Sequence, residues 1–156
     1  MTQQEALDIL KTGANVFLTG AAGSGKTYVL REYIRYLQEK GVSVGITAST
    51  GIAATHMGGT TIHSWAGIGI ADDLTHAEIG DLAEQPGLRK RFSETQVLII
   101  DEISMLHHSR LDLINKVLTT IRGGNRFFDN SEEKPFGGIQ LVLCGDFFQL
   151  PPVSRP

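Results

Sequence analysis

The segment Gly20–Thr27 constrains the fold of this chain more than any other. It reads GAAGSGKT and fits the pattern G-x-x-x-x-G-K-[ST]. Its glycines permit backbone dihedrals that turn successive N–H groups inward, where they can face an anion. The apolar run Asn15–Leu18 precedes the pattern, and the amphipathic stretch Lys26–Lys40 follows it. A strand, a glycine-rich loop and a helix in this order predict a P-loop, which holds the phosphates of a nucleotide.

Each residue type in this loop has an expected role. Lys26 places a positive charge against the β- and γ-phosphates, and Thr27 offers its hydroxyl to Mg²⁺. The helix that starts near Gly25 points the positive end of its dipole at the anion. The predicted ATP-binding residues of the loop are Gly20, Ala21, Ala22, Gly23, Ser24, Gly25, Lys26 and Thr27.

Apolar runs and helical periodicity alternate along the rest of the chain. Strands are predicted at Asn15–Leu18, Val42–Ala48, Gln96–Asp101 and Ile139–Cys144. Helices are predicted at Gln3–Leu10, Lys26–Lys40, Asp72–Phe92 with a break at Pro86–Gly87, and Leu111–Ile121. Loops, with short helical pieces in the first, are predicted at Ser49–Gly69 and Gly123–Gly138. This alternation predicts an α/β fold of the RecA-like P-loop type, with a mostly parallel sheet and helices on both faces.

Composition narrows the classes of protein to which the chain can belong. The 156 residues suffice for one domain, taken as residues 1–156, and 41% of them are hydrophobic. No apolar run approaches the roughly 20 residues that span a membrane, so no membrane partner is expected. The single cysteine, Cys144, excludes an intramolecular disulfide and a multi-cysteine metal site, and it is expected in the core. The net charge of −3 does not by itself identify a partner.

Two carboxylates follow the third predicted strand. The residues Val97–Ile100 are all apolar, and Asp101 and Glu102 come directly after them. The carboxyl end of a parallel strand is where ligands bind in open α/β sheets. There Asp101 can hold Mg²⁺, usually through water, and Glu102 can act as the general base that activates an attacking water. The pair therefore predicts ATP hydrolysis in addition to ATP binding.

A third polar group, Gln149, follows the fourth predicted strand in the segment Gly145–Gln149. Neighbouring parallel strands bring their carboxyl ends together, so Gln149 can reach the γ-phosphate or the attacking water. An amide can bond to phosphate without adding charge, which suits a sensor. From spacing alone, a polar turn before Pro151–Pro152 explains the glutamine equally well.

Four blocks of the sequence resemble the N-terminal RecA-like domain of the Pif1 family of DNA helicases, in superfamily 1B. They are NVFLTGAAGSGKT (Asn15–Thr27), TASTGIAATHMGGTTIHSWAGIG (Thr47–Gly69), LIIDEISML (Leu98–Leu106) and KPFGGIQLVLCGDFFQLPPV (Lys134–Val153). They cover roughly half of the chain. The last block is far more specific than the P-loop.

The resemblance implies an enzyme that moves 5′ to 3′ on single-stranded DNA at the expense of ATP. Lys26, Asp101, Glu102 and Gln149 are implied as catalytic residues, with Thr27 and Asp101 on the Mg²⁺ side. Gln149 would couple the γ-phosphate to DNA movement. A glutamine before the first strand reads the adenine edge in this family, and its distance from Asn15 favours Gln3, with Gln4 as the alternative. The expected location is inside the cell: the cytoplasm of a bacterium, or the nucleus or mitochondrion of a eukaryote.

The block Thr47–Gly69 resembles the DNA-contacting motifs of the family. Its hydroxyls and glycine N–H groups suit phosphate contacts that position a strand without reading its sequence. The expected DNA-binding residues are Thr50, Gly51, Thr61 and His63. Trp65 could stack on a base, although a core role for this aromatic is favoured. His107 and His108 are read as residues of the surface or of a helix start.

Members of the family also carry a second RecA-like domain, whose arginines reach across to ATP. None of it lies within these residues, so the chain is expected to be a fragment of a longer helicase. An arginine finger accelerates hydrolysis about 10³- to 10⁵-fold in P-loop enzymes. The fragment alone is therefore expected to bind nucleotide, hydrolyse it slowly and leave duplex DNA intact.

Two other classes of protein also fit the sequence. One is a P-loop ATPase that moves proteins, such as a loader or an AAA-like switch, without acting directly on DNA. The other is a nucleotide-binding module without catalysis, against which the intact Glu102 and Gln149 argue.

Overall fold

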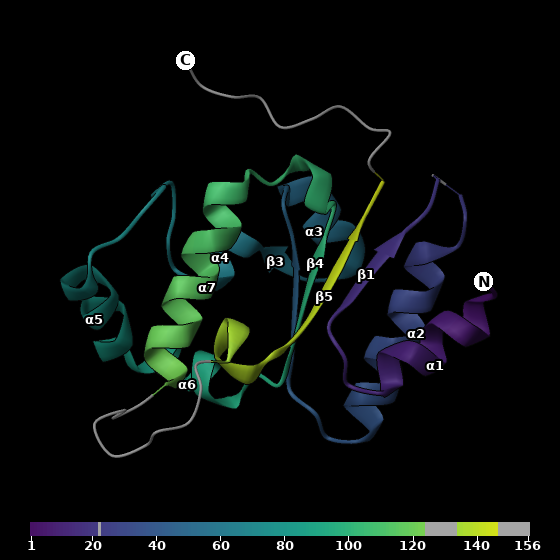
Figure 1. Ribbon diagram of the computed structural model, residues 1–156, viewed down its shortest axis with the longest axis horizontal. Coiled ribbons are helices and arrows are strands. Elements are labelled where there is room, and N and C mark those ends of the chain that lie inside the picture. The colour runs from purple at the N-terminus through teal and green to yellow at the C-terminus, as the bar shows by residue number, and fades with distance from the viewer. Residues whose placement is uncertain (22, 124–133, 147–156) are drawn as a thin grey trace.

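The computed structural model describes residues 1–21, 23–123 and 134–146, which form one sheet between two layers of helices (Figure 1). The strands are β1 (Val16–Thr19), β2 (Val44–Ala48), β3 (Thr60–Thr61), β4 (Val97–Asp101) and β5 (Gln140–Gly145). Their order across the sheet is β1-β5-β4-β2-β3, and the pairings between them are parallel. The predicted α/β class is therefore confirmed.

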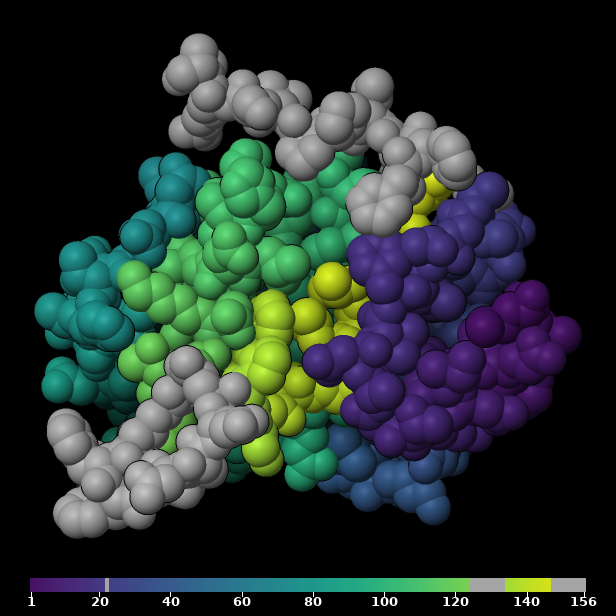
Figure 2. All heavy atoms as spheres, viewed as in Figure 1, coloured from purple at the N-terminus to yellow at the C-terminus, as the bar shows by residue number. Residues whose placement is uncertain are grey.

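Helices cover both faces of the sheet. On one face lie α1 (Gln3–Lys11), α2 (Lys26–Glu39) and α3 (Gly51–Met57). On the other lie α4 (Ile62–Trp65), α5 (His76–Glu84), α6 (Pro86–Glu94) and α7 (His108–Arg122). Two 3₁₀ turns complete the description, η1 (Ile103–Met105) and η3 (Pro135–Gly138). Figure 2 shows β5 in yellow between the purple N-terminal helices and the green α7.

Strand β4 contributes to both layers of the core. Val97 and Ile99 pack with α1 and α2, whereas Leu98 and Ile100 pack with α4 to α7. All four side chains are at most 3% exposed. This burial on both faces explains why every interior position of the strand is apolar. It leaves Asp101 and Glu102 as the first polar side chains at the end of the strand.

A buried polar network fixes the opposite end of the sheet. The Tyr33 hydroxyl of α2 donates to Gln140 Oε1 of β5 over 2.6 Å. The amide nitrogen of Gln140 donates in turn to the carbonyls of Leu10 and Ala14. Burial raises the pKa of Tyr33, so the phenol stays protonated as a donor. The network ties α1 and the segment before β1 to α2 and β5, the elements that frame the P-loop.

The structure corrects several predicted boundaries. Strand β3 was not predicted, because its two residues, Thr60 and Thr61, carry no apolar signal. The break predicted at Pro86–Gly87 lies at Gln85 instead, since Pro86 occupies the first turn of α6, where its missing N–H costs nothing. Helix α7 begins at His108, three residues before the predicted Leu111.

Cys144 is 1% exposed and packs in the core, as predicted. None of the described helices has both the length and the hydropathy of a membrane span.

Candidate functional site

The carboxyl ends of three adjacent strands bring the predicted ATP-site residues to one edge of the sheet. The P-loop follows β1, Asp146 follows β5, and Asp101 ends β4. Thr19 of β1 is in register with Gly145 of β5, and β5 lies beside β4 along its length (Figure 1). Two of the predicted residues, Ala22 and Gln149, lie outside the described part of the chain.

The P-loop has the backbone conformation that its glycines were expected to permit. Gly25 is the N-cap of α2 and has a φ of 92°, in the left-handed region. Gly20, at the start of the loop, has a φ of 155°, and a Cβ there would displace Ser24 Oγ, which would lie 2.6 Å away. The loop therefore depends on glycine at both ends.

Lys26 lies folded over the loop. Its ammonium group donates to the carbonyl of Gly20 and, over 3.0 Å, to the carbonyl of Ala21. The next residue, Thr27, is exposed on the first turn of α2. The arrangement puts one positive charge and one hydroxyl at the N-terminus of a 14-residue helix, where the helix dipole also favours an anion.

The structure distinguishes the two glutamines of α1. The Gln3 side chain lies against Gly25, where a Cβ would meet its Nε2 at 2.0 Å. Gln4 instead donates to Asp8 over 2.8 Å along the same helix. Only the Gln3 amide therefore borders the P-loop.

Glu102 has an unusual backbone. Its φ of 54° is in the left-handed region, which non-glycine residues seldom adopt, and its N–H donates to Asp101 Oδ1 over 2.8 Å. A strained residue of this kind at a strand end is a frequent feature of active sites. The backbone turns there into η1, whose Ile103 packs closely against Gly145 of β5.

Three neighbouring charges act on the carboxyl group of Glu102. Burial is the main cause that raises the pKa of this carboxyl, and the negative charges of Asp101 and Asp146 raise it further. The positive charge of Lys26 opposes the shift. Because charges act on one another strongly only at short range, the P-loop lysine and the three carboxylates share one site.

Ser49 belongs to this site and was missed from the sequence. Its hydroxyl donates to the carbonyl of Glu102 over 2.6 Å, and its N–H donates to the carbonyl of Asp101 over 3.1 Å. Both contacts cross from the end of β2 to the end of β4. The available signal was a hydroxyl directly after a strand, at the edge where the other site residues lie.

The oxygen ligands of this site suit Mg²⁺. The Thr27 hydroxyl is exposed and Asp101 is partly buried. No cluster of three or more metal-binding side chains occurs in the described ranges. Mg²⁺ commonly takes only one or two protein ligands and fills its coordination with water and substrate phosphates. The residues therefore fit Mg²⁺ bound together with a nucleotide.

The predicted DNA-binding residues gather farther along the same edge. Asp101, Ala48 and Thr61 are register partners across β4, β2 and β3. Thr50 follows two residues after Ala48, and exposed Gly51 begins α3. The predicted P-loop and carboxylates thus lie at or just after the ends of β1 and β4, and the predicted DNA-binding residues lie at or just after the ends of the next two strands, β2 and β3.

Both threonines also cap helices. Thr50 Oγ1 accepts from Ala53 N–H at the start of α3, and Thr61 Oγ1 accepts from Ser64 N–H at the start of α4. Each hydroxyl keeps its hydrogen for a further acceptor. His63 lies on α4, and burial followed by the charge of Arg110 lowers its pKa, so the imidazole is neutral at pH 7.

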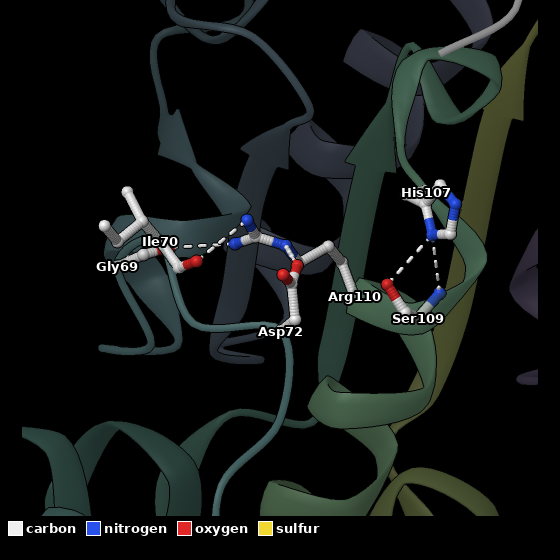
Figure 3. Close-up of polar contacts among 6 residues, drawn as sticks. All are labelled: Gly69, Ile70, Asp72, His107, Ser109 and Arg110. Carbon is white, nitrogen blue, oxygen red and sulfur yellow. Dashed lines mark hydrogen bonds and ion pairs between the residues drawn. The ribbon is translucent and has the colours of Figure 1, made fainter. Parts of the chain in front are cut away.

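The aromatic and histidine alternatives are resolved in favour of structural roles. Trp65 is 6% exposed and packs edge-to-face on Phe92, with ring centroids 5.4 Å apart. His107 is the N-cap of α7, where its Nδ1 accepts from the N–H of Ser109 (Figure 3). These are the core and helix-start roles that the sequence favoured.

The family model that matches this chain is described as PIF1-like helicase and covers residues 2–156. The "ATP-dependent DNA helicase Pif1" of Psychrobacter sp. (strain PRwf-1) is 61% identical over 154 residues, which are 99% of this chain and 22% of the relative. The human "ATP-dependent DNA helicase PIF1" is 43% identical, over 98% of this chain and 22% of its own length. The chain therefore spans about a fifth of these relatives.

Solved structures show the same similarity. The Pif1 helicase of Candida albicans superposes with a TM-score of 0.86 at 42% identity, covering 97% of this chain and 33% of the other. A Bacteroides Pif1 helicase, solved with ADP-AlF3 and single-stranded DNA, has a TM-score of 0.80 at 34% identity. This match covers 98% of the present chain and 33% of the Bacteroides chain.

Proposed function

Since the chain belongs to the PIF1-like helicase family, we propose that it is the ATP-binding and ATP-hydrolysing part of a DNA helicase motor that moves 5′ to 3′ on single-stranded DNA. The observation that carries the proposal is the common edge of the sheet. Lys26, Asp101 and Glu102 interact at its ATP end, and Thr61 lies in register with Asp101 two strands away. Relatives named ATP-dependent DNA helicase support it.

In this proposal each ATP-site residue performs one task. Lys26 and the P-loop N–H groups bind the phosphates, while Gln3 bonds to the adenine edge. Glu102 accepts a proton from the attacking water, and its raised pKa makes it a better base than an ordinary glutamate. Gln149, in the Gly145–Gln149 segment, senses the γ-phosphate.

Thr27 and Asp101 would hold Mg²⁺ as the cofactor. When bound, it would neutralise charge on the phosphates during their transfer. Asp101 holds this position from a strand end, and its own carboxylate accepts the N–H of Glu102. In this proposal Asp101 would serve the metal and Glu102 the attacking water.

The other partners in this proposal are single-stranded DNA and a second RecA-like domain. Thr50, Gly51, Thr61 and His63 would contact the DNA backbone, which carries most of the affinity in sequence-independent binding. The second domain would supply the arginines that complete the ATP site. A protein of this kind works where the cell holds its DNA, in the cytoplasm of bacteria or in the nucleus or mitochondria of eukaryotes.

The test is the ATPase rate of the full-length protein and of residues 1–156, each with and without single-stranded DNA. We expect strong DNA stimulation only in the full-length protein. Lys26→Ala should abolish ATP binding, and Thr50→Ala with His63→Ala should remove DNA stimulation. Lys40→Ala, at the far end of α2, is the matched control for a lost lysine. DNA stimulation that survives the Thr50 and His63 changes would contradict the DNA assignment.

A further inference from the structure

An arginine outside all of the predicted site residues holds the segment that follows α4. Arg110, on the first turn of α7, donates through Nη1 to the carbonyl of Gly69 over 3.1 Å and through Nη2 to the carbonyl of Ile70 over 3.0 Å. Its Nε donates to Asp72 over 3.0 Å (Figure 3). Three nitrogens of one guanidinium thus fix three successive points of a segment about 40 residues distant in sequence.

The same segment is fastened a second time. Lys116, farther along α7, donates to the carbonyl of Leu74 over 2.6 Å and to Asp73 over 3.2 Å. Together these contacts hold Gly69–Leu74, which has no helix or strand of its own, against α7. Arg110 is the more enclosed of the two cations, with a side chain 16% exposed against 36% for Lys116.

The fastened segment begins directly after a turn that bonds back to His63. The N–H of Ile68 donates to the carbonyl of His63 over 3.2 Å, and the N–H of Gly67 donates to the carbonyl of Ser64. The chain therefore turns back onto α4 immediately before the residues that Arg110 holds. A shift of Gly69 or Ile70 away from α7 would loosen this turn beside His63, while Ile62 and Trp65 keep α4 in the core.

A hollow of about 600 Å³ lies at this turn. Its lining includes Thr61, His63 and Ser64 from the start of α4, and Gly69, Ile70 and Arg110 from the fastened segment and α7. None of the described lining residues is acidic. Hydroxyl groups and an imidazole can donate hydrogen bonds to an anion, and a backbone phosphate of single-stranded DNA is the anion that the neighbouring residues would meet.

We propose that Arg110 is a positioning residue for single-stranded DNA, which holds Gly69–Asp72 against α7 so that Thr61 and His63 can contact one backbone phosphate. The proposal rests on the DNA-binding function proposed above. It assigns Arg110 an indirect role, because three of its N–H groups are already used within the protein. Its charge is already paired with Asp72, and its hydrogen bonds keep the hollow in shape.

The test uses Arg110→Ala and Arg110→Lys in the full-length protein, with fluorescence anisotropy of a labelled oligothymidylate at several salt concentrations. We expect both variants to bind the oligonucleotide about tenfold more weakly. The single ammonium group of lysine cannot replace the three guanidinium nitrogens that bond to Gly69, Ile70 and Asp72. The salt slope and the affinity for a fluorescent ATP analogue should stay unchanged. Arg35→Ala, an exposed arginine of α2 that pairs with Glu32, is the matched control.

The outcomes separate this proposal from the broader one. Unchanged DNA affinity in both Arg110 variants, with loss in His63→Ala, would overturn the role of Arg110 alone. A second result would also overturn the proposal. If Arg110→Ala lowers the slope of log affinity against log salt concentration by about 0.7, and Arg110→Lys restores it, Arg110 contacts a phosphate directly. Loss of ATP binding would show a general structural role instead. If the His63 and Arg110 variants all bind DNA normally, the DNA function itself fails.

Discussion

Ser49 donates its hydroxyl hydrogen to the main-chain carbonyl of Glu102, and this 2.6 Å contact links the segment that begins α3 to the proposed catalytic base. Thr50, the next residue, is a proposed DNA contact. The left-handed backbone of Glu102 requires support, because most side chains disfavour it. Ser49 supplies part of that support from a neighbouring strand end.

Ser49→Ala should therefore lower the rate of ATP hydrolysis without weakening ATP binding. Loss of one buried hydrogen bond of about 1 kcal/mol corresponds to a rate about fivefold lower. Ser49→Thr keeps the hydroxyl and should recover most of the rate. Steady-state kinetics of the full-length protein measure both, with Ser43→Ala at the other end of β2 as the control. An equal loss in the threonine variant would exclude the hydrogen bond as the cause.

Glu102→Gln should retain ATP binding and lose hydrolysis. The amide keeps the size of the side chain but cannot accept the proton of the attacking water, and general-base catalysis contributes about 10²- to 10⁴-fold. Single-turnover hydrolysis and titration with a fluorescent ATP analogue measure the two properties separately. Glu94→Gln, exposed at the end of α6, is the control. Hydrolysis within tenfold of wild type would assign the base to another residue.

The same substitution should stabilise the fold above neutral pH. Burial raises the pKa of Glu102 in the folded state, so its ionised form is favoured less in the fold than in the unfolded chain. Wild type therefore loses stability as the pH rises from the ordinary glutamate value, about 4.3, through the raised value. Glutamine does not titrate, so Glu102→Gln should unfold at a higher temperature at pH 8 and show a smaller advantage at pH 4. A larger advantage at pH 4 would reverse the sign of this prediction.

Gly59→Ala should destabilise the strand that carries Thr61. A Cβ at Gly59 would lie 2.0 Å from the carbonyl oxygen of Ile46, so β3 would have to move away from β2. Such overpacking typically costs about 1–3 kcal/mol. Gly80→Ala is the matched control, because a Cβ there meets nothing and alanine stabilises a helix interior by about 0.5–1 kcal/mol. Urea unfolding should move in opposite directions for the two variants, and equal shifts would contradict the contact.

Cys144 should resist thiol reagents in the folded protein. Burial, with the nearby carboxylate of Asp101, raises the pKa of this thiol to about 12. At pH 8 only about one molecule in 10⁴ carries the reactive thiolate. An aromatic disulfide reagent should therefore label the protein at pH 8 only after urea is added. Stoichiometric labelling within seconds without urea would show that the end of β5 is open.

The sequence predicted the long elements well, because their signal is carried by apolar side chains. The four apolar runs all became strands, and the strand-loop-helix order around Gly20–Thr27 was correct. The start of α7 was missed because its first turn, His108–Arg110, contains no apolar residue and takes its cap from His107. Strand β3 was missed for a similar reason, since backbone pairing to β2 defines it.

The site was predictable only where a local motif encodes it. Lys26, Asp101 and Glu102 lie within short patterns whose chemistry can be read directly, and the structure brings their charges together. Ser49 and Arg110 act through contacts to residues 53 and about 40 positions away. Such contacts depend on strand order and on the path of the chain between α4 and α5, and no periodic pattern records them.

The register of Asp101, Ala48 and Thr61 across three strands has a mechanical consequence. Adjacent strands lie about 4.8 Å apart, so the hydrogen-bond ladder sets a fixed interval of about 10 Å between the backbones of Asp101 and Thr61. A ligand at either end cannot stretch this interval without breaking the ladder. The sheet edge thus keeps the two residues at a constant spacing. A stepping motion along DNA would therefore have to arise from rotation of this domain as a rigid body against the proposed second RecA-like domain.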